Sequence, residues 1–146
     1  MDAACIDYKD TGYFSQTVID YLENVPELRS FYSYRPTLEG FAELFENKKV
    51  VADRKLLAEV LHSQYFKNHE GTSPTPIKLE AADFIRQKID LLKSDNTYTV
   101  TTGHQLNIFT GPLYFIYKIV TAIKLCRQLK DSFPDKNFVP VYWMAS

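Results

Sequence analysis

The segment from Gly103 to Pro112, GHQLNIFTGP, holds the residues best suited to chemistry in this sequence. Gly103 allows a tight turn and a close approach of the backbone to a ligand. His104 and Gln105 can both hydrogen-bond an anion or a hydroxyl group. Thr110 is placed to cap a following helix, whose first amide groups favour negative charge. We interpret the segment as a candidate cradle for an anion or a nucleotide phosphate, with a spacing that matches neither G-x-G-x-x-G nor the P-loop.

Three side chains at or after this segment have a functional and a structural interpretation. His104 either contacts a ligand or is satisfied within the fold. Lys118 shares a helix face with the apolar Ala122 and Leu129, so it either extends past the sheet edge or points a cation at a phosphate or carboxylate. Tyr114 can add a hydroxyl group at the helix start, although packing in the core is the simpler role for it.

Other classes of catalytic site find no support in the sequence. No cysteine–histidine cluster has metal-ligand spacing, so we expect no metal. The sequence also lacks a G-x-S-x-G motif, a Ser/His/Asp arrangement and a close carboxylate pair, so nucleophilic catalysis is not indicated.

The elements that must position these residues form a strand–helix–strand pattern. Thr97–Thr102 is β-branched or aromatic throughout, which predicts a strand that ends at Gly103. Gly111-Pro112 opens a helix to about Asp131, with Pro112 as its first residue. Val139–Ala145 predicts a second strand, which starts at its proline or lies at a sheet edge there. Parallel strands joined in this way bind ligands beyond their carboxyl ends, where the candidate cradle falls.

The first half of the chain predicts short amphipathic helices. Asp10 or Thr11 can cap a helix to about Glu23, and Thr37 and Asp53 can cap the next two. A fourth helix is expected over about 77–93. We therefore predict an α/β fold with three parts: a helical amino-terminal segment (1–70), a linker (71–76, GTSPTP), and the first βαβ part of a Rossmann-like parallel sheet (77–146).

Composition excludes several kinds of partner. The 17 basic and 18 acidic residues leave a net charge of −1, so neither nucleic acid nor a membrane surface is expected to bind. Residues 1–20 do not resemble a signal peptide, and Leu113–Ile123 is too short to span a membrane. The two cysteines are far apart, which suits a reduced cytoplasmic protein with Cys126 in the core. The 21 aromatic residues favour helix packing over a stacking surface for bases or sugars.

Several segments together resemble one known family, the bacterial bacillithiol-synthesis cysteine ligases (BshC). The strongest likeness is TGHQLNIFTGPLYFIYK, from Thr102 to Lys118. Further segments that resemble the family are DTGYFS (Asp10–Ser15), FYSYRP (Phe31–Pro36), EGF (Glu39–Phe41) and the closing VPVYWMAS.

The resemblance implies an enzyme that joins cysteine to glucosaminyl malate through an amide bond, the last step of bacillithiol synthesis. It also implies a Rossmann-like core related to nucleotidyltransferases, a helical coiled coil and a homodimer. The identity of any nucleotide stays open, with ATP or ADP as the candidates. Many relatives carry Gln at the position of His104, which favours hydrogen bonding over a strict general-acid role. The site residues implied are His104 as the candidate catalytic group, with Gly103, His104, Gln105, Thr110, Gly111, Tyr114 and Lys118 as candidates for binding substrate or nucleotide.

Family members are several times longer than this chain, so we expect an amino-terminal fragment that is inactive alone. Two alternatives remain open. The same segment would serve an α/β nucleotide-binding module of a nucleotidyltransferase-type enzyme, and the aromatic-rich first half would suit a non-catalytic interaction domain. A large distance between His104 and Lys118 would weaken any binding function.

Overall fold

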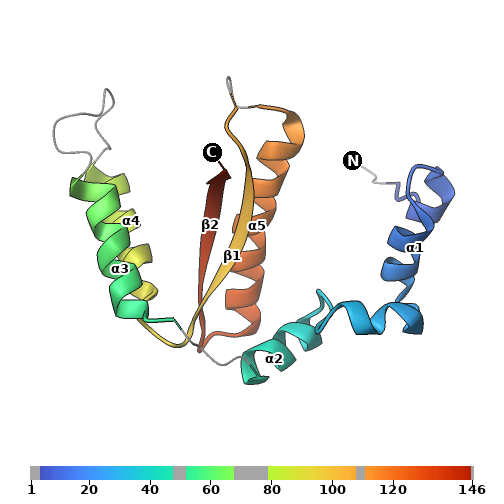
Figure 1. Cartoon of the computed structure of the whole chain (residues 1–146), viewed down its shortest axis with the longest axis horizontal. Coiled ribbons are helices and arrows are strands. Elements are labelled where there is room, and N and C mark those ends of the chain that lie inside the picture. The colour runs from blue at the N-terminus through green and yellow to red at the C-terminus, as the bar shows by residue number, and fades with distance from the viewer. Residues whose placement is uncertain (1–3, 48–51, 68–78, 108–110, 146) are drawn as a thin grey trace. The chain divides into compact units, whose positions relative to one another are not determined.

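The structure is a computed structural model that describes residues 4–47, 52–67, 79–107 and 111–145. Its chain divides into two compact units, Met1–Lys48 and Lys49–Ser146 (Figure 1). The expected linker, 71–76, lies outside the described residues. The third predicted helix, which the sequence groups with the amino-terminal segment, belongs to the second unit.

The first unit consists of short helices. Two are 3-10 helices, η1 (Tyr8–Thr11) and η2 (Pro26–Phe31), and two are α-helices, α1 (Gln16–Glu23) and α2 (Leu38–Asn47). Thr37 caps α2 as predicted, because its hydroxyl oxygen accepts a hydrogen bond from the Gly40 amide at 3.2 Å. The predicted cap of the first helix is wrong: α1 begins after Ser15, and a separate 3-10 turn takes up the residues before Gly12.

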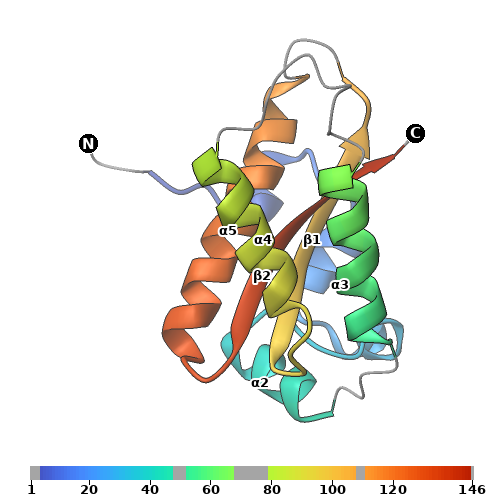
Figure 2. The same cartoon turned by 90° about the vertical axis from the view of Figure 1, so that its left-hand side faces the viewer.

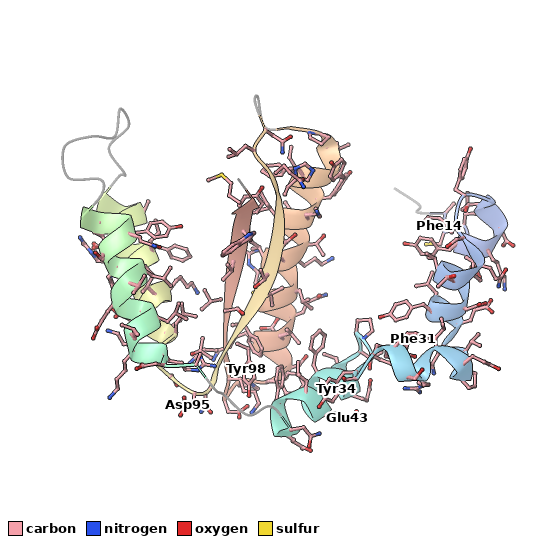
Figure 3. The ribbon with its side chains drawn as sticks, in the orientation of Figure 1. Phe14, Phe31, Tyr34, Glu43, Asp95 and Tyr98 are labelled. Atoms are coloured by element: carbon pink, nitrogen blue, oxygen red, sulfur yellow. The ribbon has the colours of Figure 1, made fainter. Side chains whose placement is uncertain are left out.

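Arg35 joins the parts of this unit that are far apart in sequence. Its guanidinium group donates to the carbonyl oxygens of Tyr21 and Leu22, near the end of α1. It also lies 5.2 Å from the centroid of the Tyr21 ring and 6.0 Å from that of Tyr32. Aromatic side chains remain on the surface of the unit, including Phe31 (81% exposed) and Phe14 (Figure 3).

The second unit is a layered α/β structure. It contains α3 (Arg54–His62), a π-helical turn η3 (Ser63–Lys67), α4 (Leu79–Leu91), β1 (Thr97–Gln105), α5 (Leu113–Ser132) and β2 (Asn137–Ala145). The strands pair in parallel, in register from Thr97↔Asn137 to Gln105↔Ala145. The helix α5 covers one face of this sheet, and α4 with α3 lies on the other (Figures 1 and 2). This arrangement confirms the predicted βαβ unit.

A small apolar core lies between these layers. On α5 the buried residues are Ala122, Cys126 and Leu129, so the predicted apolar stripe and the core thiol are confirmed. They face a sheet whose buried residues are Thr97, Phe138 and Val139. No helix among the described residues is long and apolar enough to cross a membrane.

Polar contacts hold the helices on the far side of the sheet. Asp53 caps α3 as predicted, with its carboxylate accepting from the Leu56 amide at 3.0 Å. Arg54 of the same helix donates to the carbonyl oxygens of Leu92 and Ser94, both at 3.2 Å. These carbonyl groups come directly after the end of α4, so Arg54 links the start of α3 to the end of α4 by hydrogen bonds.

Pro140 marks the outer edge of the sheet. The Asn137 amide donates to the Asn96 carbonyl at 2.9 Å, on the side of β1. Because amide groups alternate in direction along a strand, the amide position of residue 140 points away from β1. Proline has no amide hydrogen, so it costs no hydrogen bond there. The strand therefore does not start at its proline, since β2 begins at Asn137, and among the described residues Pro140 lies on the unpaired side of the sheet, the second of the two predicted positions.

The predicted end of the first strand is wrong, because β1 continues through Gly103 to Gln105. Gly103 pairs with Trp143, and a Cβ atom at position 103 would lie 2.5 Å from the Trp143 carbonyl oxygen. The glycine thus permits a close approach of the two strands where the sequence predicted a turn. The last three residues of the strand are consequently Gly103, His104 and Gln105.

Candidate functional site

The candidate site lies where the carboxyl end of β1 meets the beginning of α5. His104 and Gln105 close the strand, and Tyr114 and Lys118 lie on the first two turns of the helix. Pro112, which was predicted as the first residue of the helix, instead holds the N-cap position of α5, where its side chain offers no hydrogen bond. Thr110, the predicted cap, lies outside the described residues.

His104 is joined to the helix by Tyr114. Its Nε2 atom lies 2.5 Å from the Tyr114 hydroxyl oxygen, and the two rings are 5.2 Å apart between centroids. The Phe115 ring meets the imidazole edge-on, at 6.1 Å. His104 is partly buried by these aromatic contacts, while Tyr114 remains 52% exposed. The site therefore contains a half-exposed tyrosine whose hydroxyl group is hydrogen-bonded to an imidazole.

Lys118 lies beside the same tyrosine. Its ammonium group donates to the Gly103 carbonyl oxygen at 2.8 Å and lies 5.9 Å from the centroid of the Tyr114 ring. The sequence offered two interpretations of this lysine, and the structure shows it reaching the end of β1 as an exposed cation. His104 and Lys118 therefore share Tyr114 as a neighbour.

Asn107 is a site residue that the sequence analysis missed. Its side chain amide nitrogen lies 2.8 Å from Nδ1 of His104 and 2.8 Å from the Gln105 carbonyl oxygen. Gly111, at φ +66°, lies against it: a Cβ atom there would be 2.9 Å from Asn107 Cβ and Cγ. A turn-forming asparagine three residues after a histidine is the signal that could have identified Asn107.

Tyr142 was also missed. It comes from β2, and its hydroxyl group donates to the His104 carbonyl oxygen at 3.4 Å. Its ring packs edge-on against Phe115, with 5.3 Å between the ring centroids, and Phe115 in turn contacts His104. Gln105, by contrast, is exposed, and its carbonyl oxygen lies 2.8 Å from the Asn107 amide nitrogen and 3.1 Å from Nδ1 of His104.

A groove of about 420 Å³ adjoins these residues. Tyr114 and Lys118 line it together with Thr102 of β1 and Ala122 of α5. A small anionic molecule in this groove would lie beside the Lys118 ammonium and the Tyr114 hydroxyl. The arrangement can bind and orient an oxyanion; among the described residues, no three His, Cys, Asp or Glu side chains gather as they would around a metal.

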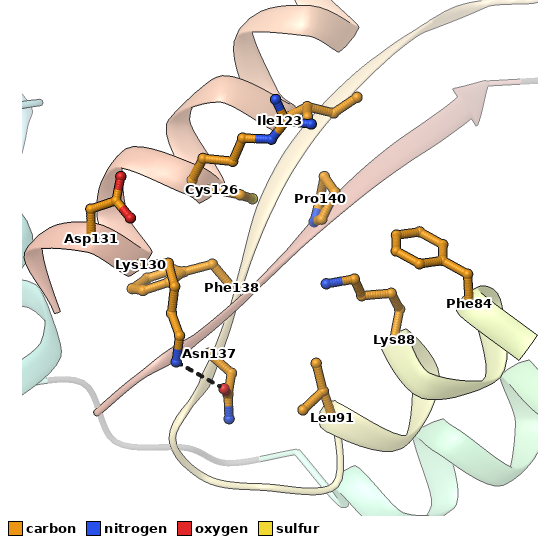
Figure 4. Close-up of a pocket in the computed structure, with 11 residues that line it drawn as sticks. Phe84, Lys88, Leu91, Ile123, Cys126, Lys130, Asp131, Asn137, Phe138 and Pro140 are labelled. Carbon is orange, nitrogen blue, oxygen red and sulfur yellow. Dashed lines mark hydrogen bonds between the residues drawn. The ribbon is translucent and has the colours of Figure 1, made fainter. Parts of the chain in front are cut away.

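A second cavity, of about 490 Å³, lies elsewhere in the second unit (Figure 4). It is bounded by Phe84 and Lys88 of α4, Lys130 of α5 and Pro140 of β2. This cavity follows the outer edge of β2. The groove beside Tyr114 follows β1 from Val100 to Thr102 and the middle of α5, and it is the better candidate because Lys118, which contacts the Gly103 carbonyl oxygen, also lines it.

Comparison with known proteins places the chain among one group of sequences. The family model "Bacillithiol biosynthesis BshC, N-terminal Rossmann-like domain" matches residues 1–146. Relatives named "Putative cysteine ligase BshC" are 44% identical in Flavobacterium psychrophilum, over 100% of this chain and 26% of the relative. In Christiangramia forsetii the figures are 45%, 100% and 26%, and in Bacillus mycoides 28%, 88% and 22%. The chain thus spans about a quarter of the length of the relatives it matches.

Proposed function

The chain belongs to the BshC family through its N-terminal Rossmann-like domain, and from this premise we propose that it serves a cysteine ligase of bacillithiol biosynthesis. The reaction would form an amide bond between cysteine and glucosaminyl malate. The amine nitrogen would bond to the carboxylate carbon and lose a proton, while a carbon–oxygen bond of that carboxylate breaks and the oxygen leaves with an activating group. Within this reaction the described residues would bind and orient an anionic group.

One observation carries the proposal. An imidazole, a phenol hydroxyl and an ammonium group meet at the carboxyl end of β1 within the Thr102–Lys118 segment, beside an open groove. Both substrates are carboxylates, and preorganised donors stabilise the negative charge that develops during acyl transfer. Lys118 would neutralise the anion, and Tyr114 would donate a hydrogen bond to it. His104 would position Tyr114, in keeping with a hydrogen-bonding role.

ATP is the candidate activating molecule. The Lys118 ammonium and the amide groups at the start of α5 are donors of the kind that phosphate oxygens accept. Transfer of the terminal phosphoryl group of ATP to the carboxylate oxygen would release ADP, and the oxygen would leave as phosphate when the amide forms. A relation of the fold to nucleotidyltransferases would agree with the binding of a nucleotide.

The whole protein is proposed to be a cytoplasmic homodimer held by a coiled coil. The described domain is proposed to be inactive alone, since the cysteine site is proposed to lie in parts of the complete protein that this chain does not span.

The test is a ligation assay with the complete protein. It would be incubated with cysteine and glucosaminyl malate, with and without ATP, and the condensed product followed by mass spectrometry. Product formation that requires cysteine supports the proposal. Absence of product under both conditions contradicts it, and pyrophosphate release without cysteine would indicate a nucleotidyl transfer instead.

A further inference from the structure

We infer that the cavity along the outer edge of β2 is a binding site for a small organic anion that has an aromatic body. The cavity has a volume of about 490 Å³ and is lined by residues of α4, α5 and β2 (Figure 4). This volume falls in the range of small-molecule sites, which combine apolar walls with a few polar groups. The inference goes beyond the proposed function and does not rest on it.

The walls of the cavity are largely apolar. Phe84 and Leu91 of α4 line it, together with Ile123 of α5 and with Phe138 and Pro140 of β2. Phe138 is buried in the core, whereas Phe84 is 58% exposed. An aromatic ligand in the cavity would therefore meet the rings of two different elements and would take the exposed ring out of water.

Lys88 supplies a positive charge that has no carboxylate partner among the described residues. The residue is half-buried, and its side chain extends from α4 into the cavity toward Pro140 (Figure 4). Its ammonium group lies 5.3 Å from the centroid of the Phe84 ring, a contact that does not neutralise the charge. Because partly buried charges are stable when they are paired, an anion in the cavity would supply the partner that Lys88 lacks.

The other charged residues of the lining come from α5. Arg127 lines the cavity and forms no ion pair within the described part of the chain. Lys130 lines it too, but its ammonium group donates to two main-chain carbonyl oxygens at 2.8 and 2.9 Å. Asp131 is the acidic member of the lining and lies at the far end of the cavity from Lys88 (Figure 4). Three cations and one carboxylate leave a positive excess, which favours an anionic ligand.

Pro140 opposes the filling of this cavity by a further strand. The amide position of residue 140 faces away from β1, and proline has no hydrogen there to donate to another strand. The part of the edge that borders the cavity, from Asn137 to Pro140, would therefore pair poorly in the complete protein. A small molecule needs no such ladder of hydrogen bonds, because its charged group would contact Lys88.

Calorimetric titration of the complete protein with four compounds tests the inference. 1-Naphthyl phosphate and 1-naphthoate have an aromatic body and an anionic group, whereas 1-naphthylmethanol has only the body and inorganic phosphate only the charge. At least one naphthyl anion should bind about tenfold or more tightly than both controls, and the tighter one identifies the group bound, phosphate or carboxylate. Affinities of both naphthyl anions no higher than those of the controls would overturn the inference.

Variants of the complete protein test the role of Lys88. Lys88→Met should weaken binding of the tighter anion by about tenfold, while Lys88→Arg keeps the charge and should weaken it by less than about threefold. Lys124→Met is the matched control, because it removes the same charge from an exposed residue outside the cavity, and it should change the affinity by less than about twofold. Equal losses in Lys88→Met and Lys124→Met would contradict the assignment.

Methyl NMR locates the bound anion. In the complete protein with ¹³C-labelled isoleucine methyl groups, Ile123 should show nuclear Overhauser contacts with the naphthyl protons, its signal being assigned with Ile123→Val. Ile116 lies about two turns earlier on α5, outside the cavity, and should show no contact. Contacts with Ile116 and not with Ile123, or with neither, would refute the inference. None of these measurements requires ligation, so a failed ligation assay would reject the proposed function alone.

Discussion

The ammonium group of Lys118 donates a hydrogen bond across 2.8 Å to the main-chain oxygen of Gly103. The contact joins the second turn of α5 to the end of β1, fifteen positions earlier in the chain. An ammonium group has three donors, so Lys118 can hold the strand and still bind an anion. Tyr114, whose ring lies beside this ammonium group, lines the same groove as Lys118.

Replacing Lys118 by Met should weaken the binding of L-malate or pyrophosphate by about tenfold, because the cation beside the groove is lost. The flexible side chain of Met keeps most of the packing, so the free energy of unfolding should change by less than about 1 kcal/mol. Calorimetry and urea unfolding measure the two effects.

Lys124→Met is the matched control, because Lys124 is an exposed residue of the same helix that does not line the groove. It removes the same charge and should leave anion affinity within about twofold. Equal losses in the two variants would show that only net charge matters.

Gly111→Ala should both destabilise the protein and weaken anion binding. The residue has φ +66°, and the added Cβ would meet Asn107 at 2.9 Å. Left-handed backbone costs alanine about 1 kcal/mol, and displacement of Asn107 adds to that cost and disturbs His104. Thermal unfolding and calorimetry would follow the change.

Gly12→Ala separates the two causes. Gly12 has φ +70°, but a Cβ atom there would meet nothing within 4 Å. This variant should therefore show the conformational cost of about 1 kcal/mol with unchanged anion affinity. If Gly111→Ala also left the affinity unchanged, Asn107 would not depend on Gly111.

Asp90 should make stability depend on pH in the acid range. Hydrogen bonds from Lys93, at 2.6 Å, and then from His62 lower the pKa of its carboxyl group below the ordinary value. A lowered folded pKa contributes stability that is complete above the unfolded pKa of about 3.9 and is lost as pH falls through the folded one.

The advantage of the wild type over Asp90→Asn should therefore shrink between about pH 5 and pH 3 in urea unfolding. Because the ion pair of Asp90 and Lys93 is exposed, added salt should also reduce this advantage of the wild type. A difference that is constant with pH would contradict this assignment.

Cys126 should react with iodoacetamide far more slowly than Cys5 in the folded protein. Cys126 is buried in the core, and this burial raises the pKa of its thiol, so less reactive thiolate forms at neutral pH. Cys5 is exposed and serves as the internal reference. Peptide mass spectrometry should find similar alkylation rates for the two cysteines only in denaturant. Equal alkylation rates in the native protein would show that the core around α5 opens readily.

Local signals predicted the helices well where one residue decides the boundary. Thr37 and Asp53 cap their helices because a side chain oxygen and an amide three residues on are neighbours in any helix start. The first helix was predicted less well, since Asp10 and Thr11 precede a 3-10 turn that ends at Gly12. Several capping residues in succession cannot be ranked by type alone.

The sequence by itself determined the parallel strand–helix–strand order, the apolar face of α5 and the segment that holds the candidate site. Only the tertiary structure decided that Gly103 continues β1, that Asn107 holds His104, and that Tyr142 of β2 closes the site. The order and the helix face follow from periodicity along the chain, which is local. The other three depend on the register between strands and on the path of a turn, where a shift of one residue sends each side chain to a different neighbour.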